Sequence, residues 1–167
     1  MPATYEPIGS ITLSSPATSM TVSSIPATYT DLKIVWSLKY QTTTQATYIR
    51  FNGDTGSNYS YTYSYSYGAG LGTSTSGNET SMLVDHNAGF STAQFVTYEM
   101  DIFSYTSSAN KMILDKMSSD NNGSGAVSRS VRCWRNSAAI NSINLFRGDG
   151  NNYATGSSMT VWGILKA

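Results

Sequence analysis

Alternating side-chain polarity limits this chain to a small number of architectures. Every even position from Leu32 to Tyr40 is apolar, and the odd positions between them include Lys33 and Lys39. Residues 95–104 repeat the pattern. Successive side chains of a strand point to opposite sides of a sheet, so both segments are predicted to be strands with one buried face. Residues 159–165 are apolar on both faces, which predicts a central strand.

Weaker forms of the same pattern predict further strands at 7–13, 19–23, 46–52, 57–67, 80–85, 111–116, 126–134 and 140–146. The connections are rich in Asn, Asp and Gly, which tolerate the positive φ of tight turns. We expect at most one short turn of helix, around residues 138–141. About ten short strands with frequent turns predict an all-β fold, a β-sandwich or jelly roll.

A length of 167 residues fits one domain, and no linker or second composition regime divides the chain. Ser and Thr together supply 47 residues, 27 and 20 respectively, yet 12 Tyr residues and regularly spaced β-branched residues argue against disorder. We predict a single β-sandwich domain over residues 1–167. Residues 1–15 could form an arm that docks on a neighbouring subunit.

The charge balance argues against several functional classes. Ten basic and ten acidic residues give a net charge of zero. Nucleic-acid binding depends on cations that neutralise phosphates, so we expect neither nucleic acid nor a membrane surface as a partner. Arg129, Arg132 and Arg135 are expected at a solvated strand end. No apolar run approaches the roughly 18 residues of a membrane span, and we expect no secretory signal. Cys133, the single cysteine, is expected to pack as a small apolar residue.

The most distinctive segment is a run of five tyrosines that alternate with Ser and Thr: Tyr59, Tyr61, Tyr63, Tyr65 and Tyr67. In a strand, all five rings would project from one face at intervals of roughly 6.7 Å, twice the rise per residue. Three interpretations stay open. The rings could stack on sugars, lie at a subunit interface, or pack within one subunit. These tyrosines are our candidate glycan-stacking or interface residues.

Groups suited to catalysis are scarce. Glu99 and Asp101 share a predicted strand face at a spacing compatible with a glycosidase pair, but a solvated face is the favoured interpretation. His86 alone cannot form a multi-histidine metal site, and the loop 120–125 lacks the downstream Glu of an EF-hand. The tripeptide 147–149 matches the integrin-recognition sequence, but we interpret it as a hairpin loop. We therefore predict no catalytic residue, no metal and no cofactor.

Three stretches carry a resemblance to a known group of proteins. They read SIPATYTDL at 24–32, RFNGDTGSNY at 50–59, and a C-terminal unit with WRNSAAINSI at 134–143 and GSSMTVWGI at 156–164. On these stretches the chain resembles small virion surface proteins of tailed phages, particularly phages of cyanobacteria and other aquatic hosts. Such proteins are capsid decoration (cement) proteins or distal domains of tail fibres. The resemblance implies a jelly-roll-like domain, often trimeric, exposed on the outer surface of the particle, with no catalytic site.

From these observations we expect a non-enzymatic virion protein. The first hypothesis is a homotrimeric decoration protein that binds the major capsid protein or another virion protein. Because it would bind only the assembled shell, it would stabilise that shell by mass action. The alternative is a carbohydrate- or receptor-binding module of a tail or head fibre that recognises a host surface glycan. A polysaccharide-degrading enzyme that uses Glu99 and Asp101 is a third hypothesis.

Overall fold

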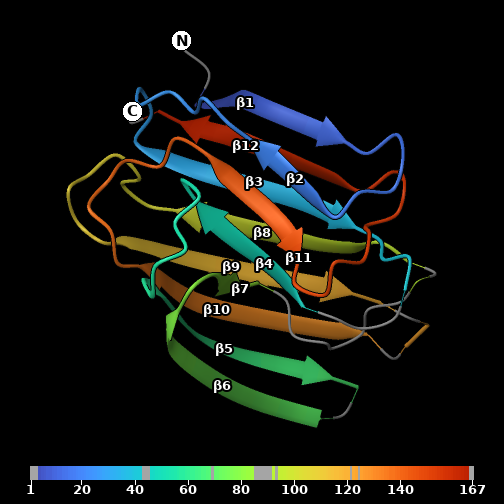
Figure 1. The fold of residues 1–167 in the computed structure, drawn as a ribbon. Helices are drawn as coiled ribbons and strands as arrows, with labels where there is room; N and C mark the ends of the chain where they lie inside the picture. Colours follow the sequence, from blue (N-terminus) through green and yellow to red (C-terminus); the bar gives the residue numbers. More distant parts are fainter. Residues whose placement is uncertain are drawn as a thin grey trace.

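The computed structural model describes residues 4–42, 46–68, 70–84, 92, 94–120, 122–123 and 125–165. Twelve strands lie in these ranges and form two antiparallel sheets (Figure 1). The large sheet has the order β1 (Tyr5–Thr12), β12 (Ser158–Ile164), β3 (Asp31–Leu38), β8 (Val96–Ile102), β9 (Lys111–Ser119), β10 (Ala126–Trp134), β5 (Tyr59–Tyr67) and β6 (Gly70–Glu79). The small sheet has the order β2 (Ser19–Val22), β11 (Ile143–Arg147), β4 (Thr47–Phe51) and β7 (Met82–Leu83). The predicted β-sandwich is confirmed.

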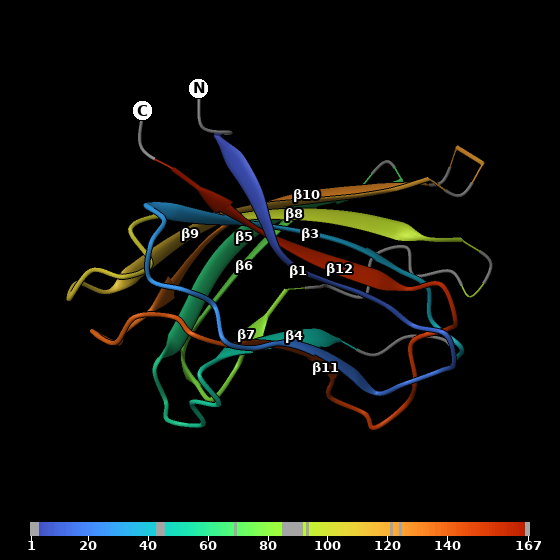
Figure 2. The same ribbon diagram turned by 90° about the horizontal axis from the view of Figure 1, so that it is seen from above.

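The core lies between the two sheets, which are stacked as layers when viewed from above (Figure 2). The even residues of β3 point inward, and Leu32, Ile34 and Leu38 are all fully buried. Trp36 on the same face stacks on Tyr98 of β8, with ring centroids 5.3 Å apart. The alternation read from the sequence is therefore the alternation between core and outer face.

Two further expectations concern the N-terminal segment and residues 138–141. Residues 5–12 do not form a free arm, because they pair with β12 as the edge strand β1 of the large sheet in the same chain. Residues 138–141, for which we expected one short turn of helix at most, form none. The side chain of Asn136 accepts a hydrogen bond from the Ala138 backbone N–H at 2.9 Å. The backbone N–H of Ile140 donates to the backbone carbonyl oxygen of Tyr105.

A buried lysine fixes the loop that precedes β9. Lys111 is fully buried, and its Nζ donates to the carbonyl oxygens of Ser107 and Ala109, both at 2.6 Å. A third hydrogen bond of 3.3 Å reaches the carbonyl of Asn136. Burial lowers the pKa of Lys111. The ammonium group thus joins two loops at one end of the sandwich.

A buried arginine, ion-paired within the large sheet, links that sheet to the small one. Arg132 of β10 and Asp115 of β9 pair on the inward face, and each side chain is 2 % exposed. The Arg132 guanidinium also donates to the carbonyl oxygens of Leu83 and Val84 at the end of β7. The expectation of a solvated position is therefore wrong for Arg132, which lies on the core face of its strand.

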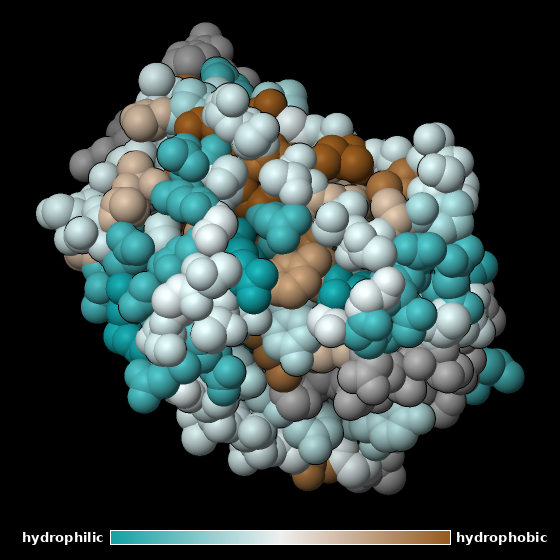
Figure 3. Space-filling view, viewed as in Figure 1, coloured by the Kyte–Doolittle hydropathy of each residue, from teal (hydrophilic) through white to brown (hydrophobic). Residues whose placement is uncertain are grey.

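The outer surface on the small-sheet side is mainly hydrophilic or of intermediate hydropathy (Figure 3). This agrees with a chain of low charge in which Ser and Thr are abundant. No helix in the described ranges is long and apolar enough to cross a membrane.

Candidate functional site

The five tyrosines of β5 all lie on the inward face of the large sheet. Their neighbours on β10 are, in order, Trp134, Arg132, Ser130, Ser128 and Ala126, and all of these are buried. The prediction that the rings share one face is confirmed. Their exposure differs, however. Tyr59 and Tyr63 are buried at 0 % and 4 %, Tyr61 and Tyr65 are half-buried, and Tyr67 is 51 % exposed.

The tyrosine contacts lie within this subunit. The Tyr59 hydroxyl accepts a hydrogen bond from the Phe51 backbone at 3.1 Å, and burial raises the pKa of Tyr59 to about 12. Along the strand, the ring centroids of Tyr61 and Tyr63 lie 6.0 Å apart, and those of Tyr63 and Tyr65 lie 5.8 Å apart. Because Tyr59 and Tyr63 are buried, they cannot belong to an exposed platform for sugars or for a partner subunit. For these two residues, the interpretation of packing within one subunit applies.

The opposite face of the same sheet carries a groove of about 890 Å³ that crosses five strands, β6, β5, β10, β9 and β8. Its outward side chains form two rows of paired neighbours, one of Thr73, Ser64, Arg129, Lys116 and Glu99, the other of Leu71, Ser66, Val127, Ser118 and Thr97. We call these ten residues and the hollow that they line the outer groove. Because five hydrogen-bonded strands carry it, its side chains are held on a rigid frame.

Five of the ten residues of the outer groove are Ser or Thr and carry a hydroxyl group. Four of the five strands contribute Ser or Thr to the two rows, from positions on the outward face such as Ser64, Ser66 and Ser118. Each hydroxyl offers one donor and two acceptor positions. The groove can therefore form many hydrogen bonds to a polar ligand without a change in its backbone.

Charged groups along one row are joined in a chain of ion pairs. Glu99 Oε2 lies 3.0 Å from Lys116 Nζ and 3.1 Å from Lys33 Nζ, and Lys33 Nζ lies 3.1 Å from Asp101 Oδ1. Hydrogen bonds from Lys116 and Lys33 hold the pKa of Glu99 below its ordinary value. A glycosidase needs a carboxyl group with a raised pKa as its general acid. The lowered pKa of its carboxyl group makes Glu99 unsuited to that role.

Arg129 occupies the centre of the groove. It is exposed, and its neighbours on the adjacent strands are Ser64 and Lys116. Among the residues that the structure describes, Arg129 has no ion-pair partner. The guanidinium is therefore available to a ligand.

Apolar side chains border the groove at two places. Leu71 on the edge strand is 88 % exposed, and Val127 is 57 % exposed. These groups can contact the apolar face of a sugar, whereas the hydroxyl groups serve its polar edge.

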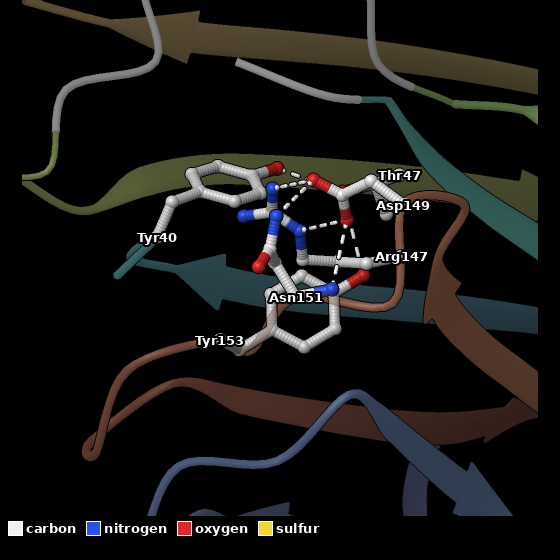
Figure 4. A network of polar contacts seen from close by, with 6 residues as sticks. All are labelled: Tyr40, Thr47, Arg147, Asp149, Asn151 and Tyr153. Atoms are coloured by element: carbon white, nitrogen blue, oxygen red, sulfur yellow. Dashed lines mark hydrogen bonds and ion pairs between the residues drawn. The ribbon is translucent and has the colours of Figure 1, made fainter. Parts of the chain in front are cut away.

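The tripeptide at 147–149 has a structural role. Arg147 is buried, and its Nε donates to Asp149 Oδ1 at 3.0 Å (Figure 4). Its guanidinium also lies over the Tyr40 ring, with 4.9 Å to the centroid. The hydrogen bonds from Arg147 lower the pKa of Asp149. With its arginine in the interior, the tripeptide is not displayed for recognition, as the hairpin-loop interpretation expects.

Other candidate groups add no further site. His86 lies outside the described residues. In the part of the chain that the structure describes, no group of three or more His, Cys, Asp or Glu residues could hold a metal ion. Cys133 points outward and is half-buried, so the expected full burial is wrong; partial burial raises the pKa of its thiol.

Fold and site together define an antiparallel two-sheet β-sandwich with a hydroxyl-lined groove on the outer face of its large sheet. No model of a protein family and no curated protein sequence matches the chain. Among solved structures, the chain is similar to the Caenorhabditis elegans galectin LEC-6, with 9 % identity over 94 % of this chain and 96 % of that one, and a TM-score of 0.38.

A second similar structure is that of the infectious bursal disease virus Gx strain. The identity is 16 % over 96 % of this chain and 39 % of that one, and the TM-score is 0.16. At such TM-scores neither likeness supports an argument about function. The outer groove itself is the basis for the proposals below.

Proposed function

We propose that this protein is a non-catalytic carbohydrate-binding module whose ligand lies in the outer groove. The observation that carries the proposal is a groove of about 890 Å³ on a rigid sheet, lined by Ser and Thr hydroxyls and bordered by exposed apolar side chains. Its volume falls within the range of about 300–1,000 Å³ that is usual for ligand sites. Sugars present the same combination of hydroxyl groups and apolar C–H faces.

The charges of the site support binding without bond cleavage. Glu99 is held ionised by two lysines, and the pKa of its carboxyl is lowered, not raised. General acid catalysis at neutral pH requires the opposite shift. The ion pairs instead hold the lysine and glutamate side chains in fixed positions along the groove.

The test is oligosaccharide binding, first on a glycan array and then by calorimetry with each sugar that binds. Ser64→Leu and Ser118→Leu would fill the groove and remove hydroxyls, and we expect each to weaken binding at least tenfold. Thr12→Leu is the matched control, because Thr12 is an exposed residue of β1 outside the groove. Binding that both groove variants leave unchanged would contradict the proposal.

Capsid decoration, with a homotrimer on the outer surface of a phage particle, stays a prediction. One observation favours contact with another protein on this face. Met112, Leu114 and Val131 point outward on neighbouring strands, and each is 47 % exposed. The test is whether the protein binds purified undecorated capsids and raises their melting temperature. Sedimentation of the free protein would determine whether it is a trimer.

A further inference from the structure

We infer that the carbohydrate recognised by the outer groove is anionic, and that Arg129 binds a carboxylate of an acidic sugar such as a hexuronate. This inference rests on the proposed function and names the ligand class of the same site. It is carried by the distribution of charge among the outward side chains of four adjacent strands, β3, β8, β9 and β10.

The neighbouring charges are already matched. Lys116 pairs with Glu99, which also pairs with Lys33, and Lys33 in turn pairs with Asp101. These two cations and two anions sum to zero. The chain of pairs therefore leaves no acidic group for Arg129, which has no ion-pair partner among the described residues.

The position of Arg129 favours an anion as its ligand. Its direct neighbour on β9 is Lys116, and like charges directly opposite each other on adjacent strands are destabilising. A bound carboxylate would remove that repulsion. A guanidinium also matches a carboxylate geometrically, because two parallel N–H groups can donate to its two oxygens.

The groups around Arg129 suit a sugar acid better than a bare anion. On one side lies the Ser64 hydroxyl on β5, and Ser118 lies two residues from Lys116 on β9. Val127, two residues before Arg129 on the same face of β10, is 57 % exposed. A hexuronate could place its carboxylate on Arg129, its hydroxyls on the serines and its C–H face on the valine.

The experiment compares each acidic oligosaccharide with its own neutral form. Oligomers of galacturonate, glucuronate and mannuronate are titrated beside their methyl esters, which keep the sugar but remove the charge. We expect at least one acid to bind tenfold or more tightly than its ester at low salt. The preference should shrink as salt is added, because screening weakens exposed charge interactions.

Variants assign the preference to a residue. Arg129→Gln should bind acid and ester equally, whereas Arg129→Lys should keep part of the preference, since it retains the charge but loses the paired donors. Neither should impair folding, because Arg129 is exposed and faces another cation. Arg50→Gln is the control, since Arg50 lies on the small sheet; it should behave like the wild type.

The outcomes separate the two proposals. Equal binding of acids and esters by the wild type, or an acid preference that survives in Arg129→Gln, would overturn the inference while carbohydrate binding stands. A protein that binds no sugar of any kind on the array would overturn the proposed function, and the inference with it.

Discussion

Asp54 accepts four hydrogen bonds, two of them from its own turn and two from the region at the end of β10. Its carboxylate accepts from Gly56 N (2.8 Å), Asn58 Nδ2 (2.9 Å), Trp134 Nε1 (2.8 Å) and Asn136 Nδ2 (3.3 Å). Burial opposes its ionisation, but these hydrogen bonds outweigh burial and hold the pKa of Asp54 below its ordinary value of 3.8. One carboxylate thus joins the turn after β4 to the end of β10.

Asp54→Asn should lower the free energy of unfolding at pH 7 by about 2 kcal/mol, the order expected for charged hydrogen bonds that are lost. The pH dependence has a definite sign. Because the folded pKa of Asp54 is lowered, the unfolded chain takes up the proton first. Its contribution is complete above pH 3.8 and is lost as the pH falls through the folded pKa.

Urea denaturation between pH 7 and pH 2 would measure both effects. Asp120→Asn is the control, because Asp120 accepts a hydrogen bond from the Gly123 backbone in an exposed turn, which Asn can also accept. An Asp54→Asn protein with the same acid sensitivity as the wild type would show that this carboxylate contributes nothing to the pH dependence.

Strand β12 depends on a glycine for its contact with the loop that precedes β3. A Cβ placed on Gly163 would lie 2.3 Å from Cγ of Tyr29, the root of the ring. Tyr29 cannot easily move, because its hydroxyl donates to Glu6 at 2.9 Å and its backbone donates to the Tyr105 hydroxyl. The ring therefore covers the strand at a place where no other side chain fits.

Gly163→Ala should lower the free energy of unfolding by about 1–3 kcal/mol, the usual cost of overpacking. Gly163→Ala combined with Tyr29→Ala should be less destabilised than the sum of the two single variants, because the clash is gone. Thermal unfolding of all four proteins completes the cycle. Strict additivity would show that the ring and the glycine are not in conflict.

Strands with strong polarity alternation could be predicted from the sequence, whereas an edge strand of Gly, Ser and Thr could not. The segments predicted at 31–40 and 95–104 correspond to β3 and β8 because one face of each is buried. Strand β6 was missed, since its residues GLGTSTSGNE show no apolar period. The Tyr65 ring covers Gly72 on its inward face, so the apolar group belongs to the neighbouring strand.

The candidate site was harder to predict than the fold. Alternation shows that the five tyrosines share a face, but it does not show whether that face meets a second sheet or solvent. The outer groove has a further requirement. The groove exists because the strand register aligns Ser64, Arg129, Lys116 and Glu99 across four strands. These residues are far apart in the sequence, and no pattern in the sequence indicates that register.

The buried side chain of Arg132 connects the two sheets of the sandwich, and its removal should lower the stability of the fold. The Arg132 guanidinium pairs with Asp115 in the large sheet and donates to two carbonyls at the end of β7 in the small sheet. It also lies 5.6 Å from the centroid of the Tyr61 ring. Removing either partner leaves the other charge buried without a counterion, which typically costs about 3–5 kcal/mol.

Arg132→Met and Asp115→Leu should therefore each destabilise the fold strongly, whereas the double variant should be less unstable than the sum of the two. Some loss should persist in the double variant, because the carbonyls of Leu83 and Val84 lose their donor in either case. Hydrogen exchange would locate that loss at β7, with β3 and β8 still protected. If instead the two losses add and protection falls evenly over both sheets, the pair is not the link between them.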